Sequence, residues 1–265
     1  MIQLGSLHRS KFCEPRTSVD EQFKEEQKLM SVEVLDRNSR VAGLSATFRK
    51  PVGGPECELV DWFLQQDIVN VPRGCRVTVF REPRLESGFP DLVVVIWNER
   101  VANKWNKERA LLSPADIRIL HYLAQQGPKS EVELSAIFSN RLHDRLRRLE
   151  LAGSIRSTKN LWHACSLAKN YAVRRIVAVE AKLSRWSEVL EQAHLNTWFA
   201  SESYVLIPQL PRSEVFSESA RMHGIGIWTK DEGRVRPARK GCGHLPLSYA
   251  SWLFNEWVWQ AARFH

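Results

Sequence analysis

Two short apolar runs with charged residues at their ends constrain the fold of this chain more than any other feature. Residues 92–97 (LVVVIW) directly follow Asp91, and residues 176–183 (IVAVEAKL) contain Glu180 and Lys182. Short runs rich in β-branched residues are typical of strands that are buried in a sheet. Ionised side chains beside such strands cost free energy unless a partner compensates their charge. The sequence therefore predicts buried strands whose charged groups need a partner, and a divalent metal ion is one candidate.

Helix-like and strand-like patterns alternate along much of the chain, which predicts an α/β fold. We expect strands at residues 76–81, 92–97, 175–183, 203–208 and 225–229, and helices that start at Glu58 and span 184–200 and 247–264. A turn-rich connection at 82–89 joins the first two strands, most simply as a hairpin. With 265 residues, of which 43% are hydrophobic, the chain can bury a real core.

The pattern changes to short helices between the second and third of these strands. Ser113-Pro114 starts one helix, since serine is a good N-cap and proline fits the first helical position. A capping box at Ser130 starts a second helix, and residues 141–151 predict a third. Residues 155–163 then predict a small hairpin. Three short helices followed by a hairpin form the winged-helix arrangement, a variant of the helix-turn-helix.

The charged residues at the second and third strands form two half-motifs. Pro90-Asp91 precedes one strand, and Glu180-Ala181-Lys182 ends the other. This combination resembles the PD-(D/E)xK nuclease superfamily, which has the restriction-endonuclease-like fold. The resemblance implies an α/β fold in which helices flank a central mixed sheet, here with an inserted winged helix-turn-helix domain. The core of that superfamily runs helix, three strands, helix, strand, and residues 58–229 supply this order once the insertion is set aside.

These patterns divide the chain into four parts. Residues 1–45 are expected to form an N-terminal tail with a helical arm. Residues 46–106 and 167–265 would be the two parts of the nuclease core. Residues 107–166 would be the inserted winged-helix DNA-binding domain.

The resemblance assigns the central roles to the residues of the half-motifs. Asp91 and Glu180 would bind Mg²⁺, with the carbonyl oxygen of Ala181 as a further ligand and Mn²⁺ as a substitute ion. Glu180 and Lys182 are two residues apart on one strand, so their side chains project to the same face. Lys182 would hold or deprotonate the attacking water and stabilise charge on the phosphate oxygens. The alternative is a structural one, in which Asp91 and Lys182 form an ion pair near a strand end.

Further residues extend the predicted site. Glu58 on the first core helix is expected to be another metal ligand, and a catalytic Gln192 would contact metal-bound water or DNA. Tyr204 could complete the glutamine-then-tyrosine pattern of one branch of the superfamily. Glu82 and Glu86 precede the first half-motif and are alternatives to Glu58.

A basic face on the third helix of the insertion predicts contact with DNA. Arg141, Arg145 and Arg148 recur at spacings of four and three residues, opposite the leucines of that helix, and Arg156 and Lys159 lie in the predicted wing. Phosphate contacts would supply affinity, and base contacts would supply specificity. The net charge of +8 also favours a polyanionic partner. A solvated basic face and a protein-contact module are the alternatives.

Together these features predict a Mg²⁺-dependent nuclease that hydrolyses phosphodiester bonds in DNA, more simply as an endonuclease. Its setting would be restriction, phage defence, repair or mobile-element DNA processing. Its expected partners are duplex DNA and either a second copy in a homodimer or a larger nuclease complex. Two alternatives stay open: a DNA-binding regulator on a nuclease-derived scaffold that no longer cuts, and a nuclease that acts on single strands or RNA.

The sequence also predicts a cytoplasmic protein with no membrane partner. No apolar run reaches the roughly 18 residues of a membrane span. The first ten residues lack the apolar core of a secretory signal. The five cysteines are widely spaced and odd in number, which favours reduced thiols over a disulfide framework.

Overall fold

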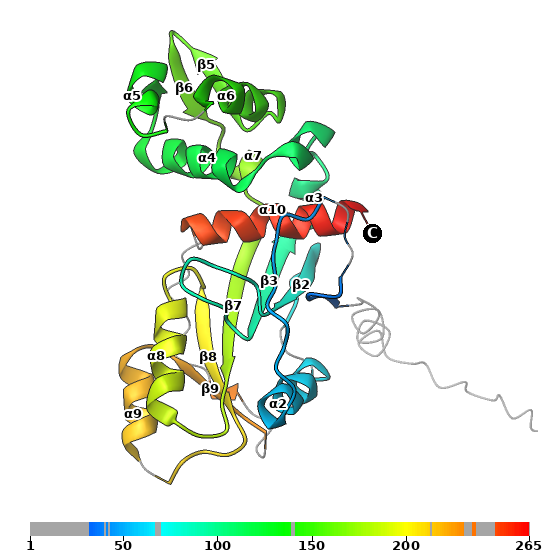
Figure 1. Cartoon of the computed structure of the whole chain (residues 1–265), viewed down its shortest axis with the longest axis vertical. Coiled ribbons are helices and arrows are strands. Elements are labelled where there is room, and N and C mark those ends of the chain that lie inside the picture. The colour runs from blue at the N-terminus through cyan, green and yellow to red at the C-terminus, as the bar shows by residue number, and fades with distance from the viewer. Residues whose placement is uncertain are drawn as a thin grey trace, which may run out of the picture. The chain divides into compact units, whose positions relative to one another are not determined.

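A mixed β-sheet lies at the centre of this α/β protein (Figure 1). The computed structural model describes residues 32–39, 41, 43–66, 70–138, 141–212, 214–230, 235–236 and 247–264. Within these residues the sheet has seven strands, in the order β1-β2-β3-β7-β8-β9-β10. The predicted N-terminal arm lies, through residue 31, outside the described part of the chain.

Five of the seven strands of the large sheet agree with the sequence prediction. They are β1 (Glu33–Leu35), β2 (Cys75–Arg81), β3 (Leu92–Asn98), β7 (Val173–Ala181), β8 (Glu202–Ile207), β9 (Gly226–Thr229) and β10 (Val235–Arg236). β2, β3 and β7 are antiparallel neighbours, whereas β7, β8 and β9 run parallel. The hairpin between β2 and β3 is confirmed. The short edge strands β1 and β10 carry no strong sequence pattern and were not predicted.

Helices cover both faces of this sheet. α2 (Pro55–Leu64) packs through Leu59, Val60 and Phe63 against one face, to which Val177, Val179 and other alternate strand residues point. The opposite face is covered by α8 (Trp186–Asn196), α9 (Glu214–Met222) and α10 (Tyr249–Phe264). Because β7 buries both of its faces, its residues form a nearly continuous apolar run.

The region between β3 and β7 forms a second, smaller layer. It contains α3 (Glu99–Ala102), η1 (Lys107–Leu111), α4 (Pro114–Gln126), β4 (Lys129–Ser130), α5 (Glu131–Ser135), α6 (Leu142–Leu151), β5 (Ile155–Thr158), β6 (Leu161–Ala164) and α7 (Leu167–Asn170). The predicted helices, the two serine caps and the hairpin are all present. Lys159 and Asn160 have φ angles of 53° and 62°, as a two-residue hairpin turn requires. The small antiparallel sheet has the order β4-β6-β5.

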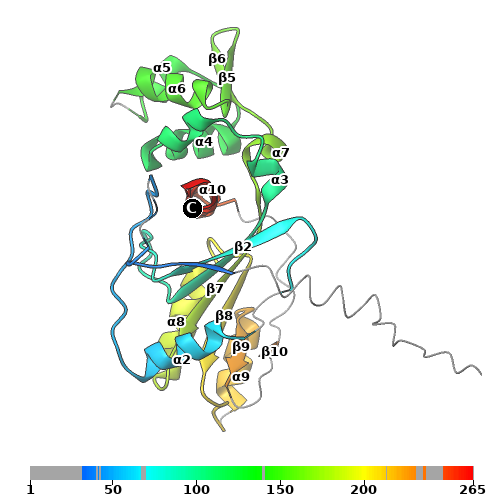
Figure 2. The ribbon, with the colours of Figure 1, turned by 90° about the vertical axis from the view of Figure 1, so that its right-hand side faces the viewer.

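The C-terminal helix α10 is buried on almost all sides. Figure 2 shows it end-on between α4 and the large sheet. Its side chains, among them Trp252, Phe254, Trp257 and Val258, belong to one apolar core that also contains residues of β3, β7, α4 and α6. A helix at such a central position is expected to be largely apolar. The inserted region and the sheet therefore share a core.

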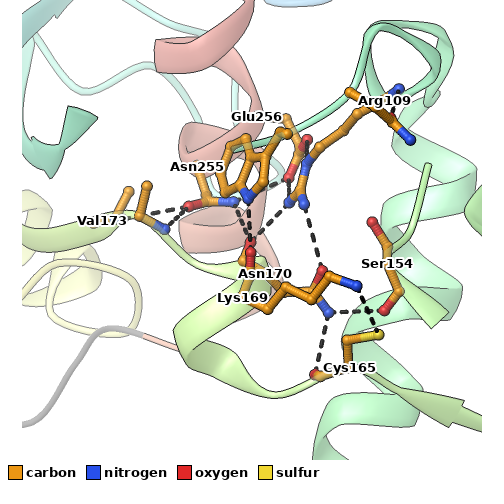
Figure 3. A network of polar contacts seen from close by, with 11 residues as sticks. Arg109, Ser154, Cys165, Lys169, Asn170, Val173, Asn255 and Glu256 are labelled. Carbon is orange, nitrogen blue, oxygen red and sulfur yellow. Dashed lines mark hydrogen bonds and ion pairs between the residues drawn. The ribbon is translucent and has the colours of Figure 1, made fainter. Parts of the chain in front are cut away.

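A buried polar network fixes both ends of the inserted region to α10 (Figure 3). Arg109 of η1 forms an ion pair with Glu256 of α10, at 2.8 Å from Nε and 2.6 Å from Nη2, and both side chains are at most 2% exposed. Arg109 also donates to the carbonyl oxygen of Asn170, at the end of α7, at 2.7 Å. Asn255 accepts hydrogen bonds from the N–H groups of Ala172 and Val173. The start of the insertion and the segment that follows it thus meet at one helix.

Among the residues that the structure describes, none of the helices combines the length and the apolar character that a membrane span requires.

Candidate active site

The two half-motifs meet at one end of the large sheet. Asp91 directly precedes β3, and Glu180 and Ala181 are the last two residues of β7. Because β3 and β7 are antiparallel, the start of one lies beside the end of the other. Oδ2 of Asp91 accepts a hydrogen bond from the N–H of Ala181 at 2.7 Å. This bond joins two segments that are 90 residues apart in the sequence.

Glu180 is a buried carboxyl with a fixed orientation. Its side chain projects to the face that α8 covers, and the residue is only 6% exposed. Nδ2 of Asn196, the last residue of α8, donates a hydrogen bond to Oε1 of Glu180 at 2.6 Å. Asn196 is itself buried, so this amide holds the carboxyl from the helix side.

The surroundings disfavour the charged forms of both carboxyls. Burial raises the pKa of Glu180 to about 8, and the neighbouring charge of Asp91 adds to the rise. Asp91 touches solvent through a cavity, but most of its surroundings are protein, and burial raises its pKa to about 6. The Ala181 N–H opposes that rise, and Glu82 reinforces it. The positive charge nearby is therefore too weak to keep both carboxyls ionised at neutral pH.

Lys182 lies at the same end of the sheet. Its N–H donates to the carbonyl oxygen of Leu206 at 3.0 Å, which continues the pairing of β7 with β8. Its Nζ lies 3.3 Å from Oε2 of Glu56, on the first turn of α2. The amine is thus half-buried between the strand end and α2.

Two cavities open at this end of the sheet, and both include Arg49, Asp91 and Lys182. The larger, of about 310 Å³, is also lined by Glu180, Gln192 and the loop before Asp91. The smaller, of about 150 Å³, is also lined by Glu56, Glu82 and Arg81. The predicted residues Asp91, Glu180, Lys182 and Gln192 therefore surround one space.

The donor set suits a hard cation with open positions. No group of three or more His, Cys, Asp or Glu side chains is arranged to hold a metal ion within the described ranges. Mg²⁺ commonly uses one or two carboxylates and completes its shell with water and substrate phosphates. Asp91 and Glu180 supply two carboxylates, and their poorly compensated charge is what such an ion would neutralise.

The structure does not bring Glu58 into this site. α2 begins at Pro55, three residues earlier than the sequence pattern indicates. Glu58 is exposed and lines neither cavity, whereas Glu56 contacts Lys182. Two residues rotate a helix by about 200°, so only one of the two acids can face the strand end. Glu56 is the acid of α2 that belongs to the site.

The remaining candidates divide between the site and other roles. Glu82 lines the smaller cavity and forms an ion pair with Arg49. Glu86 forms an ion pair with Arg118 of α4 and lines neither cavity. Tyr204 points to the α2 side of the sheet, donates a hydrogen bond to Glu202 at 2.7 Å and lines neither cavity.

Sequence reasoning missed Arg49, Glu56 and Asn196. Asn196 follows Gln192 by four residues on the same helix, so its position on the site-facing side carried a usable signal. Arg49 lies in an irregular segment, where no periodicity indicates which way a side chain points. It stacks at 5.2 Å over the ring of Phe89, the residue before the first half-motif.

The predicted basic face of α6 is divided in the structure. Arg141, Arg156 and Lys159 are exposed, as DNA contact requires. Arg148 instead holds the buried carboxylate of Asp116 with two hydrogen bonds, of 2.8 and 3.2 Å. This pair ties α6 to the capped start of α4, so Arg148 has a structural partner. Arg145 is half-buried beside a separate cavity.

Comparison of this chain with protein-family models, curated proteins and solved structures gave no match.

Proposed function

We propose that this protein is a metal-dependent deoxyribonuclease with a restriction-endonuclease-like core and an inserted winged helix. The observation that carries the proposal is that Asp91, which accepts a hydrogen bond from the Ala181 N–H, and the buried Glu180 line one cavity together with Lys182. The order α2, β2, β3, β7, α8, β8 supports it, because the PD-(D/E)xK superfamily has the same order of helices and strands.

Each residue of the site would have a distinct role. Asp91 and Glu180 would hold Mg²⁺ or Mn²⁺, with the Ala181 carbonyl as a further ligand. The bound ion would polarise a phosphate oxygen and lower the pKa of the attacking water. Lys182, steadied by Glu56, would orient that water and stabilise the negative charge that grows on the phosphate oxygens. Gln192, which lines the larger cavity, would donate a hydrogen bond to water or DNA.

Contact with duplex DNA would come from the exposed cations of the insertion. Arg141 lies at the start of α6, and Arg156 and Lys159 lie on the hairpin that corresponds to the wing. Their contacts with phosphates would supply affinity without reading sequence. Cutting both strands would require a second site, and a homodimer would provide it.

A cleavage assay with matched variants tests the proposal. The purified protein is incubated with supercoiled DNA, linear duplex, single-stranded DNA and RNA, in Mg²⁺, Mn²⁺ or EDTA. We expect metal-dependent cutting of DNA by the wild type and by Glu58→Gln, whose side chain lies outside both cavities. We expect no cutting by Asp91→Asn or Glu180→Gln.

Two results would overturn the proposal. One is wild-type cutting by well-folded Asp91→Asn and Glu180→Gln. The other is DNA binding without cutting in any metal, which would favour a regulator built on a nuclease-like scaffold. Cutting of RNA or single strands alone would reassign the substrate.

A further inference from the structure

A third cavity, of about 580 Å³, lies between the inserted region and the start of α10. Its walls come from α4, the segment after α5, α6 and Tyr249 of α10. It shares no lining residue with the two cavities at the sheet end. None of the roles assigned above uses it.

One wall of the cavity contains Arg145, which has no side-chain partner in the described part of the chain. Arg145 is half-buried in its wall, and its guanidinium makes no hydrogen bond or ion pair with any residue that the structure describes. This contrasts with Arg148, one turn further along α6, which holds Asp116. A cation held in a partly desolvated wall favours an anionic ligand.

Aromatic and apolar groups stand next to this cation. Tyr249 is fixed in place, because its hydroxyl donates to the carbonyl oxygen of Pro114 at 2.9 Å. A second guanidinium, that of Arg118, stacks over the Tyr249 ring at 4.9 Å from its centre. Phe138 and Ile137 complete the apolar side. Guanidinium groups beside aromatic rings suit a nucleotide, since phosphates meet the cations and bases stack on the rings.

An ion pair links the wall of this cavity to the loop that leads into the candidate active site. Arg118 forms an ion pair with Glu86, and the residues that follow Glu86, from Ser87 to Asp91, line the larger active-site cavity. Five residues of extended chain span at most about 17 Å. A stacked strand rises about 3.4 Å per nucleotide, so a few nucleotides would cover that distance.

We propose that this cavity binds a nucleotide of a single nucleic-acid strand that extends from the cleavage site. The proposal rests on the nuclease function argued above, because it makes the cavity a subsite for the same substrate. It implies that the protein prefers DNA with an unpaired strand next to the cut, such as a duplex with an overhang, over blunt duplex.

Binding measurements in EDTA test the subsite apart from catalysis. The probes are a labelled single-stranded 20-mer, a blunt duplex and the same duplex with an overhang. We expect Arg145→Gln to weaken binding of the single strand and the overhang by about tenfold. Arg147→Gln is the matched control, since Arg147 is an exposed arginine on the same helix. We expect it to have little effect beyond a small loss common to all three probes.

The ring is tested separately. Tyr249→Phe keeps the ring and should retain most of the affinity for the single strand, whereas Tyr249→Ala should lose it. Thermal melts of each variant identify losses that come from unfolding, and Arg145→Lys provides a conservative second variant with the charge kept.

The outcomes separate the two proposals. Wild-type affinity in folded Arg145→Gln overturns the subsite, whether or not the protein cuts DNA. An equal loss on blunt duplex overturns its preference for a single strand. Loss of strand binding in Arg145→Gln from a protein that cuts no nucleic acid supports the subsite and overturns the nuclease.

Discussion

At the scale of single residues, the chemistry of the site depends on how Asp91 and Glu180 share charge. Both pKa values lie above those of free carboxyls, chiefly because the groups are buried. Well below about pH 4 both carboxyls are protonated in the folded and the unfolded chain, so they contribute no pH dependence to stability. As the pH rises, the unfolded chain loses these protons first. To fold, the chain must then either take up those protons again or bury charged carboxylates. Both make the free energy of folding less favourable.

We therefore expect the metal-free protein to lose stability in a pH-dependent way. The loss should grow from about pH 4 and level off above pH 8, where Glu180 has also ionised. Glu180→Gln removes one titrating group at nearly constant shape, so its melting temperature should exceed that of the wild type by a margin that increases with pH. Thermal melts in EDTA from pH 5 to 8 measure the margin. A margin independent of pH would contradict the raised pKa.

Lys182 should separate metal binding from catalysis. Lys182→Met removes the ammonium but keeps both carboxyls, so we expect Mg²⁺ to stabilise the variant as it stabilises the wild type. Cutting should fall by about 10²–10⁴-fold, the usual contribution of a proton-transferring group. Thermal shifts with Mg²⁺ and single-turnover cleavage measure the two effects. Glu56→Gln is the control: it frees the amine and should reduce cutting much less.

At the level of helices and strands, local sequence patterns predicted the strands and the helix caps. They did not predict which side chains from distant parts of the chain contact one another. The runs that became β3 and β7 are apolar on both faces, so their strands could be predicted without tertiary information. The side of α2 that faces the site depends on where the helix starts. Because α2 starts at Pro55, Glu56 and not Glu58 contacts Lys182. Arg148 was expected to face DNA because its partner Asp116 lies 32 residues away, beyond the range of any local pattern.

The buried network between η1, α7 and α10 was also beyond local patterns, and it carries a prediction of its own. Glu256→Ala would leave Arg109 buried without a counter-charge, and such changes cost about 3–5 kcal/mol. Urea unfolding measures the loss. Glu188→Ala is the matched control, since Glu188 forms an exposed pair with Arg185 and should cost little. If both variants unfolded at the same urea concentration, Arg109 and Glu256 would not anchor the insertion.

In the molecule as a whole, the inserted region packs against the rest of the protein. The alternation of sequence patterns predicts a separate domain at residues 107–166. In the structure, α4 and α6 share an apolar core with α10 and the sheet. His121 and Gln125 of α4 also bond to the carbonyl oxygen of Leu247, just before α10. Residues 32–265 accordingly cluster as one compact unit.

This shared core predicts the result of removing the insertion. Replacing residues 112–165 with a short Gly/Ser linker keeps Arg109, Asn170 and Glu256, so the polar anchor of α10 survives. The apolar side of α10 that packs on α4 would become exposed, however, and each large side chain that loses its cover costs about 1.5–3 kcal/mol. We expect a product that aggregates or binds a hydrophobic dye, with a lower urea midpoint than the full chain. A soluble product that unfolds cooperatively at the wild-type midpoint would instead mean that the sheet and α10 form a self-sufficient core. The insertion would then be an independent DNA-binding domain, as the sequence pattern alone predicts.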